Sequence, residues 1–329
     1  MEDPSETILE VGERLMVSPT GREPYLRIAH FLKPSIYSIT VMNSKYHIQK
    51  DQSLVLGITE RWCSETKTFV FPWGEATVTL EDVIVLWGYS VLGDSVLSPA
   101  ESEDLQEIEE NLKEARRRIV ATKAKKACQS LWINTFMNSG KELEHQAFLA
   151  CWLSRYVFAG VHGTISEHVF PVAIQLARGT RIALAPAVLA SIYRDLSLLK
   201  EKIVVATNSK SCKDVKNGVL ELTLRSILFG SNLELQPKPN VLNYGDLRMA
   251  RWDKVNCLKV ENVRLSLELA GGEGFLWRPY AMAMGGWKFP NFYSEKEIWV
   301  PVGPGLDEEL PSFARCMRVS ELVGFGYVE

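Results

Sequence analysis

The sequence predicts a predominantly helical α+β protein, in which a small lobe with a β-hairpin and a capped helix packs on a larger helical lobe. Three observations lead to this prediction. A hairpin pattern runs directly into helix-capping residues between Thr68 and Gly88. From Phe148 onward, apolar residues recur at helical spacing. Hydrophobic residues make up 46% of the 329 positions, enough to bury a sizeable core.

Composition and pattern divide the chain into four segments. Residues 1–22 are expected to be a loose leader, and 23–93 the N-terminal part of the domain, with the hairpin. Residues 94–127 form a charged helical insertion, and 128–329 the helical C-terminal part of the same domain. We find no internal repeat.

Two helices are expected before the hairpin. The first covers residues 25–32, where apolar side chains fall at helical spacing and Pro34 ends the helix. The second lies near residues 54–62. Residues 68–71 then read as a strand, Pro72-Trp73-Gly74-Glu75 as a turn, and 76–80 as a return strand with alternating apolar side chains.

A capping box is predicted where the return strand ends. Thr79 and Asp82 have the required spacing, acidic residues fall in the first helical turn, and Gly88 suits a left-handed C-terminal cap. Glycosidase and metal sites also use paired carboxylates, but Glu81 and Asp82 are adjacent and point in different directions on a helix. We therefore expect Glu75, Glu81 and Asp82 to be structural.

Residues 94–127 combine an acid-rich half with a base-rich half. Glu109–Lys113 and Glu114–Arg118 are four positions apart with the acid first, the favourable order on a helix. The segment is expected to be one long solvated helix or a partly ordered insertion.

The second lobe is predicted to contain several helices. An apolar stripe runs through residues 148–157, and residues 167–178 form a further helix that Gly179 ends. Pro186 suits the first turn of the next helix. One more short helix is expected within residues 312–329.

No catalytic, metal-binding or cofactor-binding residues emerge from the motifs. The six cysteines form no CxxC pair, which indicates a reducing compartment without structural zinc, and the five histidines lack the spacing of HExxH or HxH. Neither a P-loop, a GxGxxG sequence nor a GxSxG elbow is present. No membrane association is expected, because the longest apolar stretch, residues 182–193, is too short to span a bilayer.

One basic cluster could bind phosphates or act as a nuclear-localisation signal. It consists of Arg116, Arg117, Arg118, Lys123, Lys125 and Lys126. Acidic residues precede the cluster, so the favoured interpretation is an ordinary solvated face of a helix. The formal net charge of −3 also argues against strong global attraction to nucleic acid.

The stretch ERWCSETKTFVFPWGEATVTLEDVIVLWGYSVLG resembles the signature of the plant mobile domain, also called the aminotransferase-like plant mobile domain. Three further blocks match in order: FLACWLSRYVFAG with HVFPVAIQLARGTRIALAPAVLASIYRDL, then FLWRPYA, then SFARCMRVSELVGF. They cover most of the chain, and the 94–127 segment matches least. The structural signature residues are Trp62, Phe71, Pro72, Trp73, Gly74, Glu75, Thr79, Asp82 and Gly88.

The resemblance implies a domain spread by plant transposable elements and retained in host genes. Host members similar to the maintenance-of-meristems-like proteins are nuclear and act in meristem maintenance, genome stability and transposon silencing. The implied partners are other plant mobile domain proteins and a phosphatase-7-like protein, with chromatin or DNA as a further candidate. Many members continue past the SELVGF block, so this copy, which ends at Glu329, is expected to be a shortened one.

Three functions remain open at this point. The favoured one is a non-enzymatic nuclear protein that regulates gene expression through protein partners. A transposon-derived, transposase-like DNA-binding protein is the alternative that the basic cluster suggests. A pyridoxal-dependent aminotransferase-like enzyme rests on the family name alone, because no lysine lies in a Gly/Ser-rich phosphate-binding context.

Overall fold

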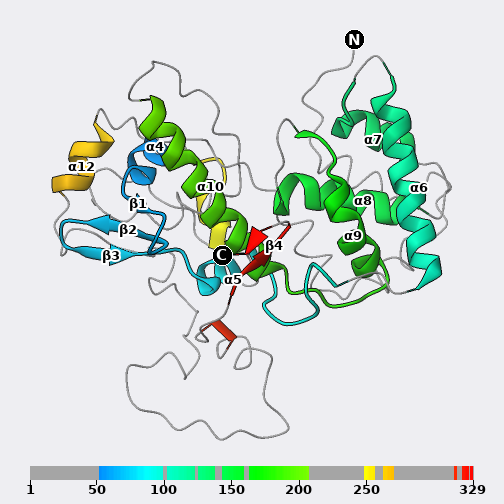
Figure 1. The fold of residues 1–329 in the computed structure, drawn as a ribbon, viewed down its shortest axis with the longest axis horizontal. Helices are drawn as coiled ribbons and strands as arrows, with labels where there is room; N and C mark the ends of the chain where they lie inside the picture. Colours follow the sequence, from blue (N-terminus) through cyan, green and yellow to red (C-terminus); the bar gives the residue numbers. More distant parts are fainter. Residues whose placement is uncertain are drawn as a thin grey trace, which may run out of the picture.

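A computed structural model describes ten stretches of the chain (Figure 1). These are residues 52–98, 102–122, 125–137, 143–158, 163–206, 248–255, 262–269, 315–316, 321–325 and 327–328. The predicted leader at 1–22, the predicted helix at 25–32, Lys123 and the FLWRPYA block lie outside them.

The predicted hairpin forms part of a small antiparallel sheet with the strand order β1-β2-β3. Helix α4 (Gln52–Thr59) precedes the sheet. Its strands are β1 (Trp62–Cys63), β2 (Thr68–Phe71) and β3 (Gly74–Ala76). Phe71 pairs with Gly74, so only Pro72 and Trp73 form the turn.

The return strand is predicted at residues 76–80, but it covers Gly74–Ala76, so it begins two residues earlier and ends at Ala76. After Ala76, the hydrogen bonds to the backbone come from side chains and not from a neighbouring strand. The Thr77 hydroxyl donates to the Lys67 carbonyl at 2.6 Å, and the carbonyl of Val78 accepts from the Tyr193 hydroxyl at 2.6 Å. The apolar alternation past Ala76 therefore reflects burial of Val78, not strand pairing.

Helix α5 (Leu80–Trp87) begins and ends as the sequence predicts. Thr79 is the N-cap of a complete capping box with Asp82. Gly88 is left-handed with φ 73°, and its N–H donates to the Ile84 carbonyl at 2.7 Å.

We call residues 103–177 the helical lobe, which lies on the right in Figure 1. Its elements are α6 (Glu103–Val120), α7 (Gln129–Phe136), α8 (Glu144–Trp152), the π-helix η1 (Leu153–Val157), the 3-10 helix η3 (Glu167–Val169) and α9 (Phe170–Ala177). Helix α9 is buried along almost its whole length, and α6 and α8 pack against it. The helix predicted at 167–178 is confirmed, with a tighter first turn.

Helix α6 confirms the predicted long helix, but it is not solvated on all sides. Leu112 and Ile119 are buried, and Leu105, Ile108 and Ala115 pack against the core on the same face. Their spacing of three or four positions creates a narrow apolar stripe. The opposite face is charged and exposed.

The sheet lobe, on the left in Figure 1, contains α4, α5 and the strands together with elements from much later in the chain. These are α10 (Leu184–Ala206), the 3-10 helix η5 (Arg248–Trp252) and α12 (Val263–Leu269). Helix α10 packs on α4, α5 and β1, while α12 packs on α4. Pro186 lies in the first turn of α10, as predicted. Among the described helices, none is both long and apolar enough to cross a membrane.

A backbone strap joins the two lobes between residues 90 and 94 on one side and 181 and 185 on the other. Asp94 N–H donates to the Arg181 carbonyl at 2.8 Å, and Ala183 N–H donates to the Asp94 carbonyl at 2.9 Å. Gly93 has φ 125°, and a Cβ there would lie 2.3 Å from the Arg181 carbonyl oxygen. Only glycine allows this approach without displacing the backbone.

The C-terminal residues form a small hairpin, β4 (Val323–Gly324) with β5 (Tyr327–Val328). The predicted short helix is represented in the described residues only by Arg315 and Cys316. Strand β4 packs on α10, whereas the Phe325 ring meets Phe158 of the helical lobe edge to face at 4.8 Å. The end of the SELVGF block therefore touches both lobes.

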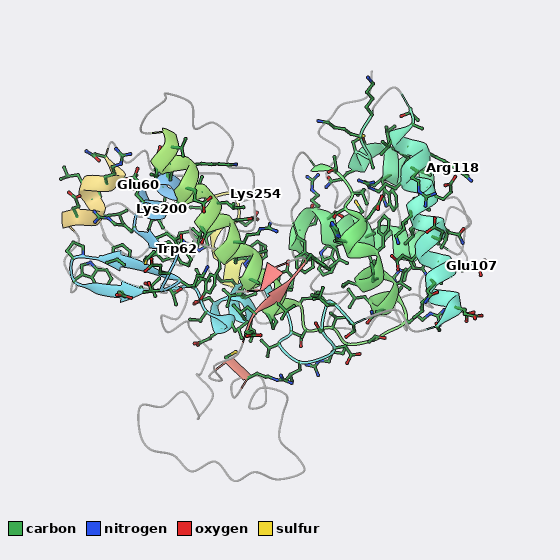
Figure 2. The ribbon with its side chains drawn as sticks, in the orientation of Figure 1. Glu60, Trp62, Glu107, Arg118, Lys200 and Lys254 are labelled. Atoms are coloured by element: carbon green, nitrogen blue, oxygen red, sulfur yellow. The ribbon has the colours of Figure 1, made fainter. Side chains whose placement is uncertain are left out.

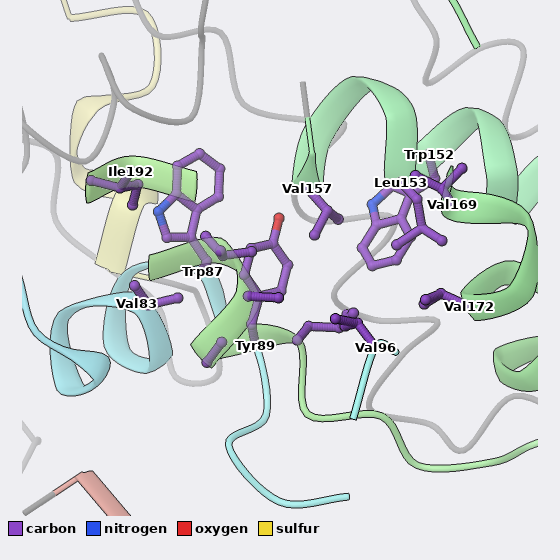
Figure 3. Close-up of a cluster of buried hydrophobic side chains, with 14 of the residues drawn as sticks. Val83, Trp87, Tyr89, Val96, Trp152, Leu153, Val157, Val169, Val172 and Ile192 are labelled. Atoms are coloured by element: carbon purple, nitrogen blue, oxygen red, sulfur yellow. The ribbon is translucent and has the colours of Figure 1, made fainter. Parts of the chain in front are cut away.

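One continuous hydrophobic core extends through both lobes. Figure 3 shows its centre, where Trp87 and Ile192 lie on one side and Leu153, Val157 and Val172 on the other. The predicted α+β, mainly helical fold with a small hairpin lobe on a larger helical lobe is thus confirmed.

Candidate interaction surfaces

Aromatic residues of β1 and β2 hold the sheet to α10. Trp62 is 2% exposed, and its indole N–H donates to the Ser197 hydroxyl at 3.0 Å. Its ring lies 5.0 Å from Phe69 and 5.4 Å from Tyr193. A buried tryptophan of this kind contributes both apolar area and a directional bond. Its environment is that of a structural residue.

Two aromatic rings at the turn of the hairpin pack against the core, where Phe71 is buried and Trp73 is half-buried. The rings of Phe71 and Trp73 stack with centroids 4.8 Å apart and planes 4° from parallel. Pro72 and Gly74 are exposed between and beside them. Glu75 is exposed, and its carboxylate accepts from the Thr68 hydroxyl across the strands at 2.9 Å.

Glu81 and Asp82 lie in the first turn of α5. Asp82 is fully buried and accepts from the Thr79 N–H at 2.6 Å and from the Thr79 hydroxyl at 2.9 Å. Cys316 lies nearby, where burial first, then the charges of Glu81 and Asp82, raise the pKa of its thiol to about 11. A thiol with such a pKa stays protonated and is a poor nucleophile at neutral pH.

The basic cluster separates into three kinds of residue. Arg116 is turned inward: its Nε donates to the Ile165 carbonyl at 2.8 Å, and its Nη1 meets the Glu167 carboxylate at 2.6 Å. Arg116 thus fastens α6 to the chain entering η3. This arrangement leaves its guanidinium poorly placed to bind a phosphate.

Arg117 and Arg118 lie on the exposed face of α6 and pair with acids of the same helix. Arg117 forms ion pairs with Glu110 and, at 2.8 Å, with Glu114. Arg118 forms an ion pair with Glu114 at 3.0 Å. The predicted pair Glu109–Lys113 is present at 2.6 Å. Lys125 and Lys126 are exposed just beyond the helix, and Lys123 lies outside the described residues.

Buried titratable groups of the helical lobe are held in their neutral forms. Burial lowers the pKa of His145 to about 4 and raises the pKa of Cys151 to about 12. Cys151 lies buried within α8, where a protonated thiol behaves as a small hydrophobe. Across the described stretches, no group of three or more His, Cys, Asp or Glu side chains is arranged to hold a metal ion.

Sequence reasoning missed the residues at the lobe junction. Tyr89 is 1% exposed; its hydroxyl donates to the Tyr156 carbonyl in the π-helix at 3.0 Å, and its ring lies near Trp87 and Trp152 (Figure 3). Burial raises the pKa of Tyr89 well above its usual value, so the hydroxyl keeps its proton for this bond. The only sequence signal is an aromatic residue directly after a helix-ending glycine.

A family model places this chain among known proteins. The model described as plant mobile domain matches residues 36–329. The chain belongs to the plant mobile domain family. The resemblance seen in the hairpin and in the three later blocks is therefore confirmed.

Three Arabidopsis thaliana relatives illustrate what the chain is similar to. It is 40% identical over 57 residues to Protein MAINTENANCE OF MERISTEMS, 46% over 50 residues to Protein MAIN-LIKE 2, and 51% over 49 residues to a serine/threonine-protein phosphatase 7 long form homolog. These alignments cover 15–17% of this chain and 4–12% of the relatives, so they reach only a small part of each relative. No solved structure matches the chain.

Proposed function

We propose that this plant mobile domain protein is a non-enzymatic nuclear factor that acts through protein partners in meristem maintenance, transposon silencing and regulation of gene expression. The observation that carries the proposal is membership of the family, together with similarity to the MAINTENANCE OF MERISTEMS and MAIN-LIKE proteins. A phosphatase-7-like protein and other plant mobile domain proteins are the proposed partners.

The structural roles of the family's signature side chains support this proposal. Trp62 is bound to Ser197, and Asp82 and Thr79 cap α5. These groups build the scaffold, which leaves the outer faces for recognition. Association through such faces needs no reactive group.

Affinity purification from plant nuclei tests the proposal. The full chain, tagged and expressed in plant cells, should be nuclear and should recover a phosphatase-7-like protein or a second plant mobile domain protein. A matched bait with Trp62→Ala and Asp82→Ala should lose these partners because its sheet lobe is weakened. Exclusion from the nucleus, or recovery of neither partner, would contradict the proposal.

The other two functions give different results in simple assays. A DNA-binding protein would give a gel shift that weakens with salt and with charge reversal of Arg117, Arg118, Lys125 and Lys126. An aminotransferase-like enzyme would develop an absorbance band on addition of pyridoxal phosphate. Arg116 is left unchanged in the DNA experiment because its contacts are internal.

A further inference from the structure

The outer face of α6 separates charges of opposite sign along its length. Carboxylates occupy the first turns, at Glu103, Asp104 and Glu107, and all three are exposed. Cations occupy the other end, at Arg117 and Arg118. Figure 2 shows Glu107 and Arg118 toward opposite ends of the helix, at the outer edge of the molecule.

The charges at the two ends of α6 are neutralised to different degrees. At the basic end, Arg117 and Arg118 are paired with Glu110 and Glu114 from the middle of the helix. In contrast, Glu103, Asp104 and Glu107 make no ion pair with any described residue. The exposed Lys125 and Lys126 extend the basic end, and they too have no carboxylate partner within the described stretches.

The two charged ends of α6 are far enough apart for a second helix, lying alongside, to contact both. At about 1.5 Å per residue, Glu103 and Arg118 are separated by roughly 22 Å along the axis. A copy of the same helix laid antiparallel would place its acidic end against this basic end, and the reverse. A parallel copy would bring like charges together. A twofold axis repeats the same contact twice, as in an isologous interface.

We propose that α6 is a self-association surface, on which a second copy of this chain docks antiparallel through its acidic and basic ends. The face offers exposed charges and polar side chains, among them Gln106 and Asn111, in place of an apolar patch. Exposed ion pairs contribute little each, so the dimer is weak, reversible and sensitive to salt. The proposal does not depend on the function proposed above.

Sedimentation equilibrium of the full chain at low and high salt provides the test. The wild type should associate weakly at low salt and be monomeric at high salt. An acid-end variant, E103K/D104K/E107K, and a basic-end variant, R118E/K125E/K126E, should each remain monomeric at low salt. An equimolar mixture of the two should associate again, because both helix ends are then complementary.

Two controls distinguish the charge effect from misfolding and from net charge. Neutral substitution, E103Q/D104N/E107Q, removes the attraction without placing cations at the helix N-terminus, and it should also give a monomer. Reversal of three exposed acids elsewhere, E65K/E201K/E321K, changes the net charge equally and should leave association unchanged. A wild type that is monomeric across the concentration series at low salt would overturn the proposal. So would a dimer that the acid-end variants do not affect, or failure of the mixture to associate.

Discussion

The two lobes share one core, but they are stabilised in different ways. The helical lobe is contiguous in sequence and is centred on α9, which lies buried among its neighbours; its polar links, such as Arg116 to Glu167, join segments of the same lobe. The sheet lobe is assembled from distant segments joined by directional bonds, such as Trp62 to Ser197, Lys200 to the Glu60 carbonyl at 2.5 Å, and Arg61 to Glu268 at 3.0 Å. Figure 2 labels Glu60, Trp62 and Lys200 in this region. A small sheet has little core of its own and depends on such long-range links, whereas the helices of the other lobe can bury their apolar faces against one another.

The largest effect should come from emptying the helical lobe. Trp132 is 1% exposed, stacks on Phe170 at 5.6 Å and donates to the Ala147 carbonyl at 2.9 Å. Trp132→Ala should lower the free energy of unfolding by about 3–5 kcal/mol, because it leaves a cavity that helices cannot close. Urea denaturation measures the change. A loss below 1 kcal/mol would mean that packing does not dominate in this lobe.

A change in the strap should affect both lobes. Gly93→Ala forces a side chain to within 2.3 Å of the Arg181 carbonyl at positive φ. We expect a loss of about 2–3 kcal/mol from the combined overlap and strain. Gly163, which is also left-handed but has open space around its Cβ position, offers a matched control. Gly163→Ala should cost less, and equal losses would show that strain alone matters.

Acid should weaken the helical lobe through His145. Burial holds its folded pKa at about 4, below the unfolded value of about 6.5. Between these values the unfolded chain binds a proton that the folded chain does not, so stability falls as the pH is lowered through this window. The loss between pH 7.5 and pH 5 should be about 2 kcal/mol. Comparison with His145→Asn isolates this contribution, because the variant cannot titrate there; identical pH profiles would refute the assignment.

Removing one directional bond of the sheet lobe should cost less. Ser197→Ala leaves the buried Trp62 indole without its acceptor, and we expect a loss of about 1 kcal/mol. Combining Ser197→Ala with Trp62→Phe in a double-mutant cycle measures the bond itself. A coupling energy near zero would mean that Trp62 acts through packing alone, as in the helical lobe.

The smallest effect should come from the surface of the sheet lobe. Arg264 pairs with Glu60 where α12 meets α4, and its side chain is 68% exposed. Arg264→Ala should cost less than about 1 kcal/mol and nothing measurable at high salt. Thermal unfolding at two salt concentrations checks this. A larger, salt-independent loss would place this pair among the main supports of the lobe.

Local features of this fold could be predicted from the sequence. The capping box at Thr79 and Asp82, the left-handed Gly88 and the ion pairs of α6 each depend on residues within a few positions of one another. The apolar stripe of α6 also follows from local spacing, at Leu105, Ile108, Leu112, Ala115 and Ile119. The many charged residues of the segment favoured a fully solvated helix instead.

Features that join distant segments could not be predicted in this way. The bond from Tyr89 to Tyr156, the strap at Asp94 and the contact of Phe325 with Phe158 depend on which segments meet in space. The inward turn of Arg116 toward Ile165 and Glu167 is of the same kind, since three adjacent arginines look alike in sequence. Tertiary packing alone makes one of them internal.

The separation of Trp62 from Ser197 by 135 positions has a consequence for synthesis of the chain. A ribosome completes the segments of the helical lobe before α10 emerges, so that lobe can acquire its packing early. Trp62 and its sheet, although translated first, pair with a helix that is translated much later, and closing so long a loop is entropically slow. During synthesis the apolar side of this sheet therefore stays uncovered for longer than the helices of the other lobe.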